Sequence, residues 1–180
     1  MNELEKVICN DVMADHQYVV DLRRYFHMNP ETAKEEFGTA KRIEEELDKL
    51  GIEHKRVGET GVYAEIKGNL AGDKTIVLRA DIDALDVEEA HECPYKSTIP
   101  GKMHACGHDG HTALGLSLAR WIGENKDELC GSFVLIFQPA EEGTRGAAPI
   151  AAKGWVDDVD YFFAGHCGMY CQKGEIGICS

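Results

Sequence analysis

Residues 75–85 read Thr75-Ile76-Val77-Leu78-Arg79-Ala80-Asp81-Ile82-Asp83-Ala84-Leu85, an apolar run that leads into two carboxylates. A second stretch has the same form, since Gly131-Ser132-Phe133-Val134-Leu135-Ile136-Phe137 is followed by Gln138-Pro139-Ala140-Glu141-Glu142-Gly143. Continuous apolar runs of this length are typical of strands that are buried on both faces of a sheet. The two stretches therefore predict central strands with polar residues at their carboxyl ends.

The rest of the chain alternates between helical and strand patterns. Phe37, Ala40, Ile43, Leu47 and Leu50 recur at steps of three and four, which predicts a helix that ends at Gly51. Further helices are expected over 12–27, 110–122 and 147–153, further strands over 52–56, 61–66, 161–163 and 174–178, and a long irregular segment over 80–107. This alternation indicates an α/β layered domain, in which ligands bind beyond the carboxyl ends of the strands.

The segment with the most reactive side chains is Met103-His104-Ala105-Cys106-Gly107-His108-Asp109-Gly110-His111. Cys106 and His108 are two positions apart, so on a turning backbone both could reach one metal ion or two adjacent ions. A divalent ion would deprotonate the Cys106 thiol, and Asp109 could cap the helix that follows. The alternative is that these are satisfied polar groups near a helix start.

Two carboxylates, Glu141 and Glu142, follow the buried strand that ends at Phe137. Adjacent side chains on an extended chain point to opposite sides, so one carboxylate could bind metal while the other faces substrate. Glu142 and Glu141 would take these roles in that order. Burial beside other anions tends to raise the pKa of a carboxylate, which suits a general base. A solvated turn is the alternative.

His166 and the Asp81/Asp83 pair also follow apolar strands. A third potential ligand at a strand end favours a shared metal site over a chance placement of these residues. Carboxylates near such a site often orient the ligands, although Asp81 and Asp83 could equally be surface turn residues.

The composition excludes some other functions. The formal net charge is −13, from 19 Lys and Arg against 32 Asp and Glu, and no basic cluster indicates a nucleic-acid partner. No apolar run is long enough to cross a membrane, and residues 1–6 do not resemble a secretory signal, so a cytoplasmic location is expected. The seven cysteines are irregularly spaced, which favours reduced thiols over a disulfide framework.

Taken together, these motifs resemble the N-acyl-amino-acid amidohydrolases, the family of hippurate hydrolase and the plant auxin-conjugate hydrolases, within the aminoacylase and carboxypeptidase clan of dinuclear metallopeptidases. The resemblance starts at Leu22-Arg23-Arg24 with His27, Pro30 and Glu31. It continues in order through 78–85, Pro94-Tyr95, 100–111, 138–143 and Gly165-His166. It implies a three-layer α/β/α catalytic domain with a mixed central sheet.

The resemblance also implies roles for individual residues. Cys106, His108, Glu142 and His166 would bind two divalent ions, with Mn²⁺ or Zn²⁺ expected first and Co²⁺ or Ni²⁺ also compatible. Glu141 would take a proton from a metal-bridged water, which attacks the amide carbonyl, and would pass it to the leaving amine. Asp81 or Asp83 would support the site, and Asp83 is named with Glu141 as a candidate catalytic residue. The expected substrate is a small N-acyl amino acid.

The chain departs from the family in length. Family members are roughly twice as long and carry a small lid and dimerisation domain and a late histidine ligand. Residues 1–180 are therefore interpreted as the N-terminal part of the catalytic domain, without the lid domain and the C-terminal catalytic segment. Homodimers are expected for full-length members, and independent activity of this chain is in doubt.

Two rival hypotheses assign no catalysis to the chain. One is a binding module in which Cys106, His108, Cys167 and Cys171 form a closed structural zinc site, which leaves Glu141 and Glu142 unexplained. The other is an inactive half-domain that acts as an interaction protein. Metal stoichiometry separates the three: two ions per chain indicate the hydrolase, one tight zinc the structural site, and none the inactive half-domain.

Overall fold

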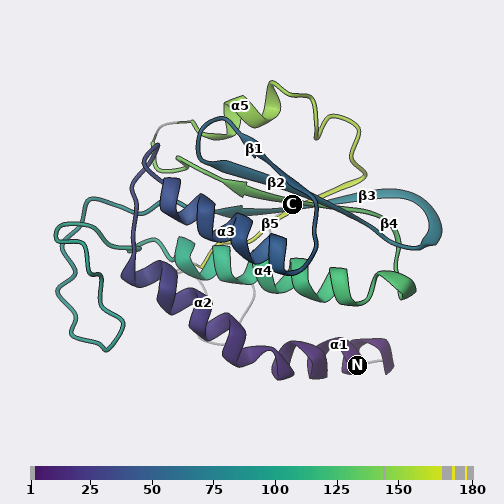
Figure 1. Ribbon diagram of the computed structural model, residues 1–180, viewed down its shortest axis with the longest axis horizontal. Coiled ribbons are helices and arrows are strands. Elements are labelled where there is room, and N and C mark those ends of the chain that lie inside the picture. Colours follow the sequence, from purple (N-terminus) through teal and green to yellow (C-terminus); the bar gives the residue numbers. More distant parts are fainter. Residues whose placement is uncertain (1–2, 144, 168–171, 173–176, 178–180) are drawn as a thin grey trace.

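A computed structural model describes residues 3–143, 145–167, 172 and 177 of the chain (Figure 1). Within these residues the helices are α1 (Glu3–Ala14), α2 (His16–Met28), α3 (Phe37–Lys49), α4 (His108–Glu124) and α5 (Ala147–Ala151), with a 3₁₀ turn at Lys126–Glu128. The strands are β1 (His54–Val57), β2 (Gly61–Lys67), β3 (Leu70–Asp81), β4 (Cys130–Gln138) and β5 (Tyr161–Ala164). The α/β class predicted from the sequence is confirmed.

The five strands form one mixed sheet in the order β1-β2-β4-β3-β5. β1 and β2 make an antiparallel hairpin, with Gly58 at φ +61° in the connection, and β2 pairs antiparallel with β4. β3 is parallel to both of its neighbours, with Asp81 opposite Gln138 of β4 and Arg79 opposite Ala164 of β5. The carboxyl ends of β3, β4 and β5 therefore meet at the same edge of the sheet.

Helices cover the two faces of the sheet unequally. α2, α3 and α4 lie on one face, and their apolar residues pack with Val62, Ala64, Leu135 and Phe137 of the sheet in the larger core (Figure 1). On the opposite face, Tyr63, Val77 and Ile136 pack with Ile150 of α5 and with Trp155. This arrangement gives the three layers expected for the fold, the second helical layer being a single short helix and the segment after it.

One expected element differs in the structure, and another lies almost entirely outside the described residues. The single helix expected over 12–27 is divided at Asp15 into α1 and α2. The Asp15 carboxylate accepts hydrogen bonds from Ser117 Oγ (3.1 Å) and Arg120 Nη1 (2.7 Å) of α4, so tertiary contacts hold the break. Of the strand expected over 174–178, only residue 177 is among the described residues.

The connection from β3 to α4 contains neither helix nor strand, as predicted from its composition. It is nevertheless anchored: the backbones of Leu85 and Met103 form a bridge, and the buried Glu89 carboxylate accepts the Ser97 N–H at 2.7 Å. These bonds hold the chain that leads into Cys106 and His108.

Across the described part of the chain, no helix combines the length and the apolar character that crossing a bilayer would require.

Candidate metal centre

Potential metal ligands gather at the edge of the sheet where β3, β4 and β5 end. Asp81 and Asp83 come from the end of β3, Glu141 and Glu142 follow β4, and His166 follows β5. α4 begins at the same edge, at His108, because Gly107 adopts φ +86° and turns the chain into the helix. A left-handed conformation of this kind favours glycine, so Gly107 is what allows Cys106 and His108 to flank so sharp a bend.

His108 is the central side chain of this group. It is completely buried, and its Nδ1 lies 2.9 Å from the backbone carbonyl oxygen of Asp83. That bond places the ring proton on Nδ1 and leaves the lone pair on Nε2, which has no hydrogen-bond partner among the described residues. A buried imidazole held in this tautomer is the usual state of a histidine that binds metal.

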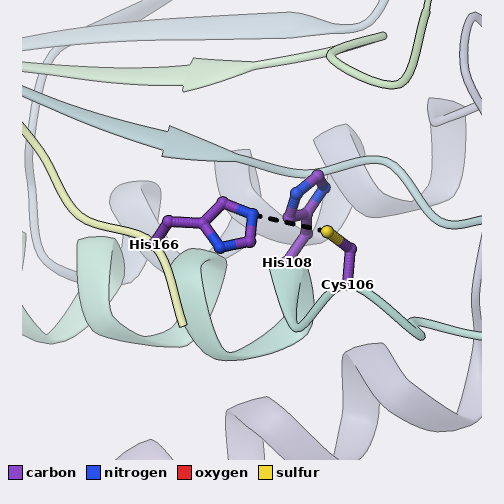
Figure 2. A group of neighbouring side chains, drawn as sticks. All are labelled: Cys106, His108 and His166. Atoms are coloured by element: carbon purple, nitrogen blue, oxygen red, sulfur yellow. Dashed lines mark hydrogen bonds between the residues drawn. The ribbon is translucent and has the colours of Figure 1, made fainter. Parts of the chain in front are cut away.

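Cys106 and His166 approach His108 from two directions. The Sγ atom of Cys106 lies 3.4 Å from Nε2 of His166, and the His166 and His108 rings are 5.5 Å apart in an edge-to-face arrangement (Figure 2). Each of the three side chains offers one donor atom, and the three atoms lie within 4.8 Å of one another. One thiol and two imidazoles from separate segments thus face a common point.

Glu141 and Glu142 complete the group, but not in the way the sequence suggested. They were expected on extended chain with their side chains on opposite sides, whereas they lie in a turn that follows Ala140 at φ +54°. As a result both carboxylates, together with His108, place an oxygen or nitrogen within 4.8 Å of the others. The turn brings both carboxylates toward the same ring.

Asp83 connects two parts of the site. Its Oδ2 accepts the backbone N–H of Glu142 at 2.9 Å, its Oδ1 lies 3.3 Å from His108 Nδ1, and its backbone carbonyl receives that same nitrogen. Asp81 is engaged elsewhere, since its Oδ1 binds Arg79 at 2.9 Å and 2.6 Å. Of the two aspartates, Asp83 is therefore the one placed to orient candidate ligands.

Asp109 does not cap α4 as the sequence suggested. The N-cap position belongs to Gly107, and no side chain caps this end of the helix. Asp109 is instead buried in the first turn, where its Oδ2 lies 2.8 Å from His27 Nδ1 and 2.7 Å from Arg23 Nε. The other nitrogen of His27 lies 3.3 Å from Glu89. This network joins α2, the long connection and α4, and no spacing in the sequence indicated its pairing.

Burial and neighbouring charges shift several pKa values in the site. Burial, assisted by the Glu142 and Glu141 carboxylates, raises the pKa of the Cys106 thiol to about 11. Burial raises the pKa of Asp83, but hydrogen bonds from His108 and from the Glu142 backbone outweigh it and lower the net value. Burial lowers the pKa of His108, but Asp83 outweighs it and raises the net value. An excess of negative charge at a buried imidazole and a half-buried thiol is an environment that favours a cation.

The residues fit a divalent metal ion by their chemistry. Sulfur, nitrogen and oxygen donors converge around His108, and the buried Nε2 of that ring has no hydrogen-bond partner among the described residues. The closed zinc site considered from the sequence is less well supported. Among the described residues Cys167 joins no group with Cys106 and His108, and Cys171 lies outside that part of the chain.

The chain is similar to several known proteins. The chain is 45% identical over 176 residues to thermostable carboxypeptidase 2 of Saccharolobus solfataricus, covering 96% of this chain and 44% of that protein. It is 42% identical to the IAA-amino acid hydrolase ILR1-like 5 of Arabidopsis thaliana, covering 88% of this chain and 36% of that protein. The crystal structure of the Bacillus subtilis protein YXEP, described as a dinuclear metal binding peptidase of the M20 family, superposes with a TM-score of 0.81 at 40% identity. That match covers 86% of this chain and 44% of YXEP.

The chain thus spans less than half the length of these relatives. The model of the family described as Peptidase family M20/M25/M40 matches residues 77–179, which is more than half of the 180 residues and includes every candidate ligand. Together, the fold, the site and this match show that the chain belongs to peptidase family M20/M25/M40.

Proposed function

We propose that this chain provides the metal-binding centre of an amidohydrolase that cleaves the amide bond of N-acyl amino acids or related small amide conjugates. The observation that carries the proposal is the convergence of Cys106, His166, Glu141 and Glu142 around His108, whose buried Nε2 has no hydrogen-bond partner among the described residues. A relative named for hydrolysis of an acylated amino acid supports the choice of substrate class.

Cys106, His108, Glu142 and His166 are the residues that we assign to metal binding. They would hold two divalent ions, Mn²⁺ or Zn²⁺ first, with Co²⁺ or Ni²⁺ as alternatives. When bound, the ions supply a water that is acidic enough to act as a nucleophile near neutral pH, and positive charge beside the attacked carbonyl oxygen. Asp83 holds the His108 ring through its carbonyl and the Glu142 backbone through its carboxylate.

Glu141 is assigned as the general base and acid. Its carboxylate lies in the same turn as Glu142 and near His108, so it can take a proton from a water held at this point and return it to the leaving amine. The water oxygen forms a bond to the acyl carbon, the amide C–N bond breaks, the proton ends on the amine nitrogen, and Glu141 regains its charge. With Glu141 assigned to move the proton, Glu142 would be free to hold a metal ion.

Metal stoichiometry separates this proposal from its rivals. The chain is stripped with chelator, titrated with Zn²⁺ and Mn²⁺, and its bound metal measured by elemental analysis. Two ions per chain are expected. One tightly bound zinc would favour a closed structural site, and no binding would favour an interaction protein that has lost the centre.

Replacing Glu141 with Gln tests the assignment of the base. Glu141→Gln keeps the size of the side chain but removes its ability to accept a proton, so we expect kcat to fall by about 10²- to 10⁴-fold. The assay is hydrolysis of a panel of N-acyl amino acids by metal-loaded protein, with bound metal measured in parallel. Bound metal should stay at the wild-type level, and the exposed Glu128→Gln serves as the matched control. Lost metal with unchanged turnover per ion would make Glu141 a ligand rather than the base.

A further inference from the structure

The segment that carries His166 packs against the beginning of α4. An added Cβ at Gly107 would lie 3.2 Å from Cβ of Cys167, and one at Gly110 would lie 3.9 Å from its Sγ. The two glycines thus leave space into which the Cys167 side chain packs. Cys167 follows β5, whereas Gly107 and Gly110 lie 60 and 57 positions earlier in the chain. The contact is therefore a close approach of two segments that are distant in the sequence.

His111, one turn further along α4, holds the backbone of the same segment. Its Nε2 accepts the Cys167 N–H at 2.9 Å. A nitrogen that accepts a hydrogen bond uses its lone pair to do so, which leaves the ring proton on Nδ1. His111 is 6% exposed, and its ring lies 4.7 Å from the His166 ring and 5.1 Å from the His108 ring.

The contact bears directly on the orientation of His166. Nδ1 of His166 lies 2.7 Å from the carbonyl oxygen of Cys167, the residue whose N–H is held by His111. Both hydrogen bonds thus involve the Cys167 backbone, and together they leave His166 Nε2 directed at Cys106 Sγ, 3.4 Å away (Figure 2). If the Cys167 backbone moved, the His166 ring would lose this direction.

We infer that His111 is a positioning residue, which fixes the Cys167 backbone on α4 and thereby aims the Nε2 atom of His166 at the metal centre. His111 also belongs to a group with Asp81 and His108 whose donor atoms lie within 4.8 Å. It is not assigned as a ligand, because its Nε2 lone pair is taken by the Cys167 N–H and its unpartnered Nδ1 then carries the ring proton. The consequence for metal binding rests on the proposed function, whereas the contact between His111 and Cys167 does not depend on it.

Three variants of the 180-residue chain test this role. His111→Leu fills the space but has no acceptor. His111→Gln retains an amide oxygen near the position of Nε2, and His111→Asn is polar but too short to reach it. His91→Leu is the matched control, because it removes one imidazole from an exposed position of the long connection. Thermal unfolding of each variant establishes that it is folded before other measurements are compared.

The first measurement is hydrogen exchange of the Cys167 amide in metal-free, ¹⁵N-labelled protein. Loss of the acceptor should speed this exchange by about 10-fold or more in His111→Leu and His111→Asn, with a much smaller effect in His111→Gln. Wild-type exchange in both His111→Leu and His111→Asn would overturn the inference, whether or not the chain binds metal.

The second measurement is titration with Co²⁺, followed by the thiolate-to-cobalt absorption band of Cys106. We expect affinity to fall about 10- to 100-fold in His111→Leu, as for residues that orient metal ligands, and to be largely restored in His111→Gln. The band should persist at saturation, because Cys106 and His108 are unchanged. Unaltered affinity in His111→Leu despite faster Cys167 exchange would show that the contact does not aim His166, and so would overturn the inference. A wild-type chain without Co²⁺ binding would instead count against the proposed function.

Discussion

The core beneath α2, α3 and α4 and the centre at the carboxyl edge of the sheet are built in opposite ways. In the core, Ala40, Ile43, Leu47 and Leu116 are completely buried and carry no polar side-chain atom. At the centre the buried side chains are imidazoles and carboxylates. Of seven buried side-chain nitrogen and oxygen atoms without a hydrogen-bond partner in the described residues, three belong to Asp83, His108 and His111 of the centre.

This contrast separates what stabilises the fold from what serves the site. Apolar burial stabilises the folded chain, whereas a buried polar atom without a partner costs free energy. His108 Nε2 is therefore destabilising unless a ligand satisfies it. The two regions share α4, which buries Leu116 in the core and carries His108 and His111 into the centre.

The largest effect is expected from a change in the core. Phe26 of α2 is 1% exposed, so Phe26→Ala should lower the free energy of unfolding by about 3–5 kcal/mol through lost apolar burial and a cavity. Urea unfolding of metal-free protein measures it. Phe37→Ala is the control, because Phe37 is 54% exposed and should change stability far less. Equal effects of both changes would contradict the assignment of the core.

A change at the centre should affect ligand binding and leave the fold intact. Cys106→Ser replaces a thiolate donor with a poor one, and we expect metal affinity to fall about 100-fold, at least as much as for residues that only orient ligands. Isothermal titration with Zn²⁺ measures the affinity, and Cys130→Ser, at an exposed thiol, is the control. Urea unfolding of the metal-free variant should match wild type. Unchanged affinity would remove Cys106 from the proposed ligand set.

The smallest effect concerns the polar rim of the core, where Glu46 binds Arg42 at 2.7 Å and Lys49 at 2.8 Å. Burial raises the pKa of Glu46, but the Lys49 hydrogen bond and the Arg42 charge outweigh it and lower the net value. A lowered folded-state pKa adds stability that is present above the unfolded value, near 4.5, and is lost as the pH falls through the folded value.

Replacing Glu46 with Gln should remove this pH dependence. Glu46→Gln should lower the free energy of unfolding by about 1 kcal/mol at pH 7, and the difference from wild type should shrink toward pH 3. Urea unfolding across this range measures it, with the more exposed Glu45→Gln as the control. A difference that grows on acidification would show that the sign is wrong. Metal affinity should not change, because Glu46 lies in α3 and belongs to none of the candidate ligand groups.

Much of the fold followed from the local sequence. The apolar runs at 75–79 and 131–137 lie in β3 and β4, and the three- and four-residue spacing after Phe37 is α3. Such patterns are readable because burial on one face repeats with the period of the element. The break at Asp15 was missed because its cause is a contact with Ser117 and Arg120, about a hundred positions away.

The same division holds for the site. The sequence alone determined which residue types stand at the strand ends, because a thiol, imidazoles and paired carboxylates are identifiable wherever the chain carries them. Only the tertiary structure decided which of them meet, that Glu141 and Glu142 share one turn, and that Asp109 pairs with His27 while His111 holds Cys167. Those outcomes depend on strand order and on single hydrogen bonds between distant segments, which local patterns do not encode.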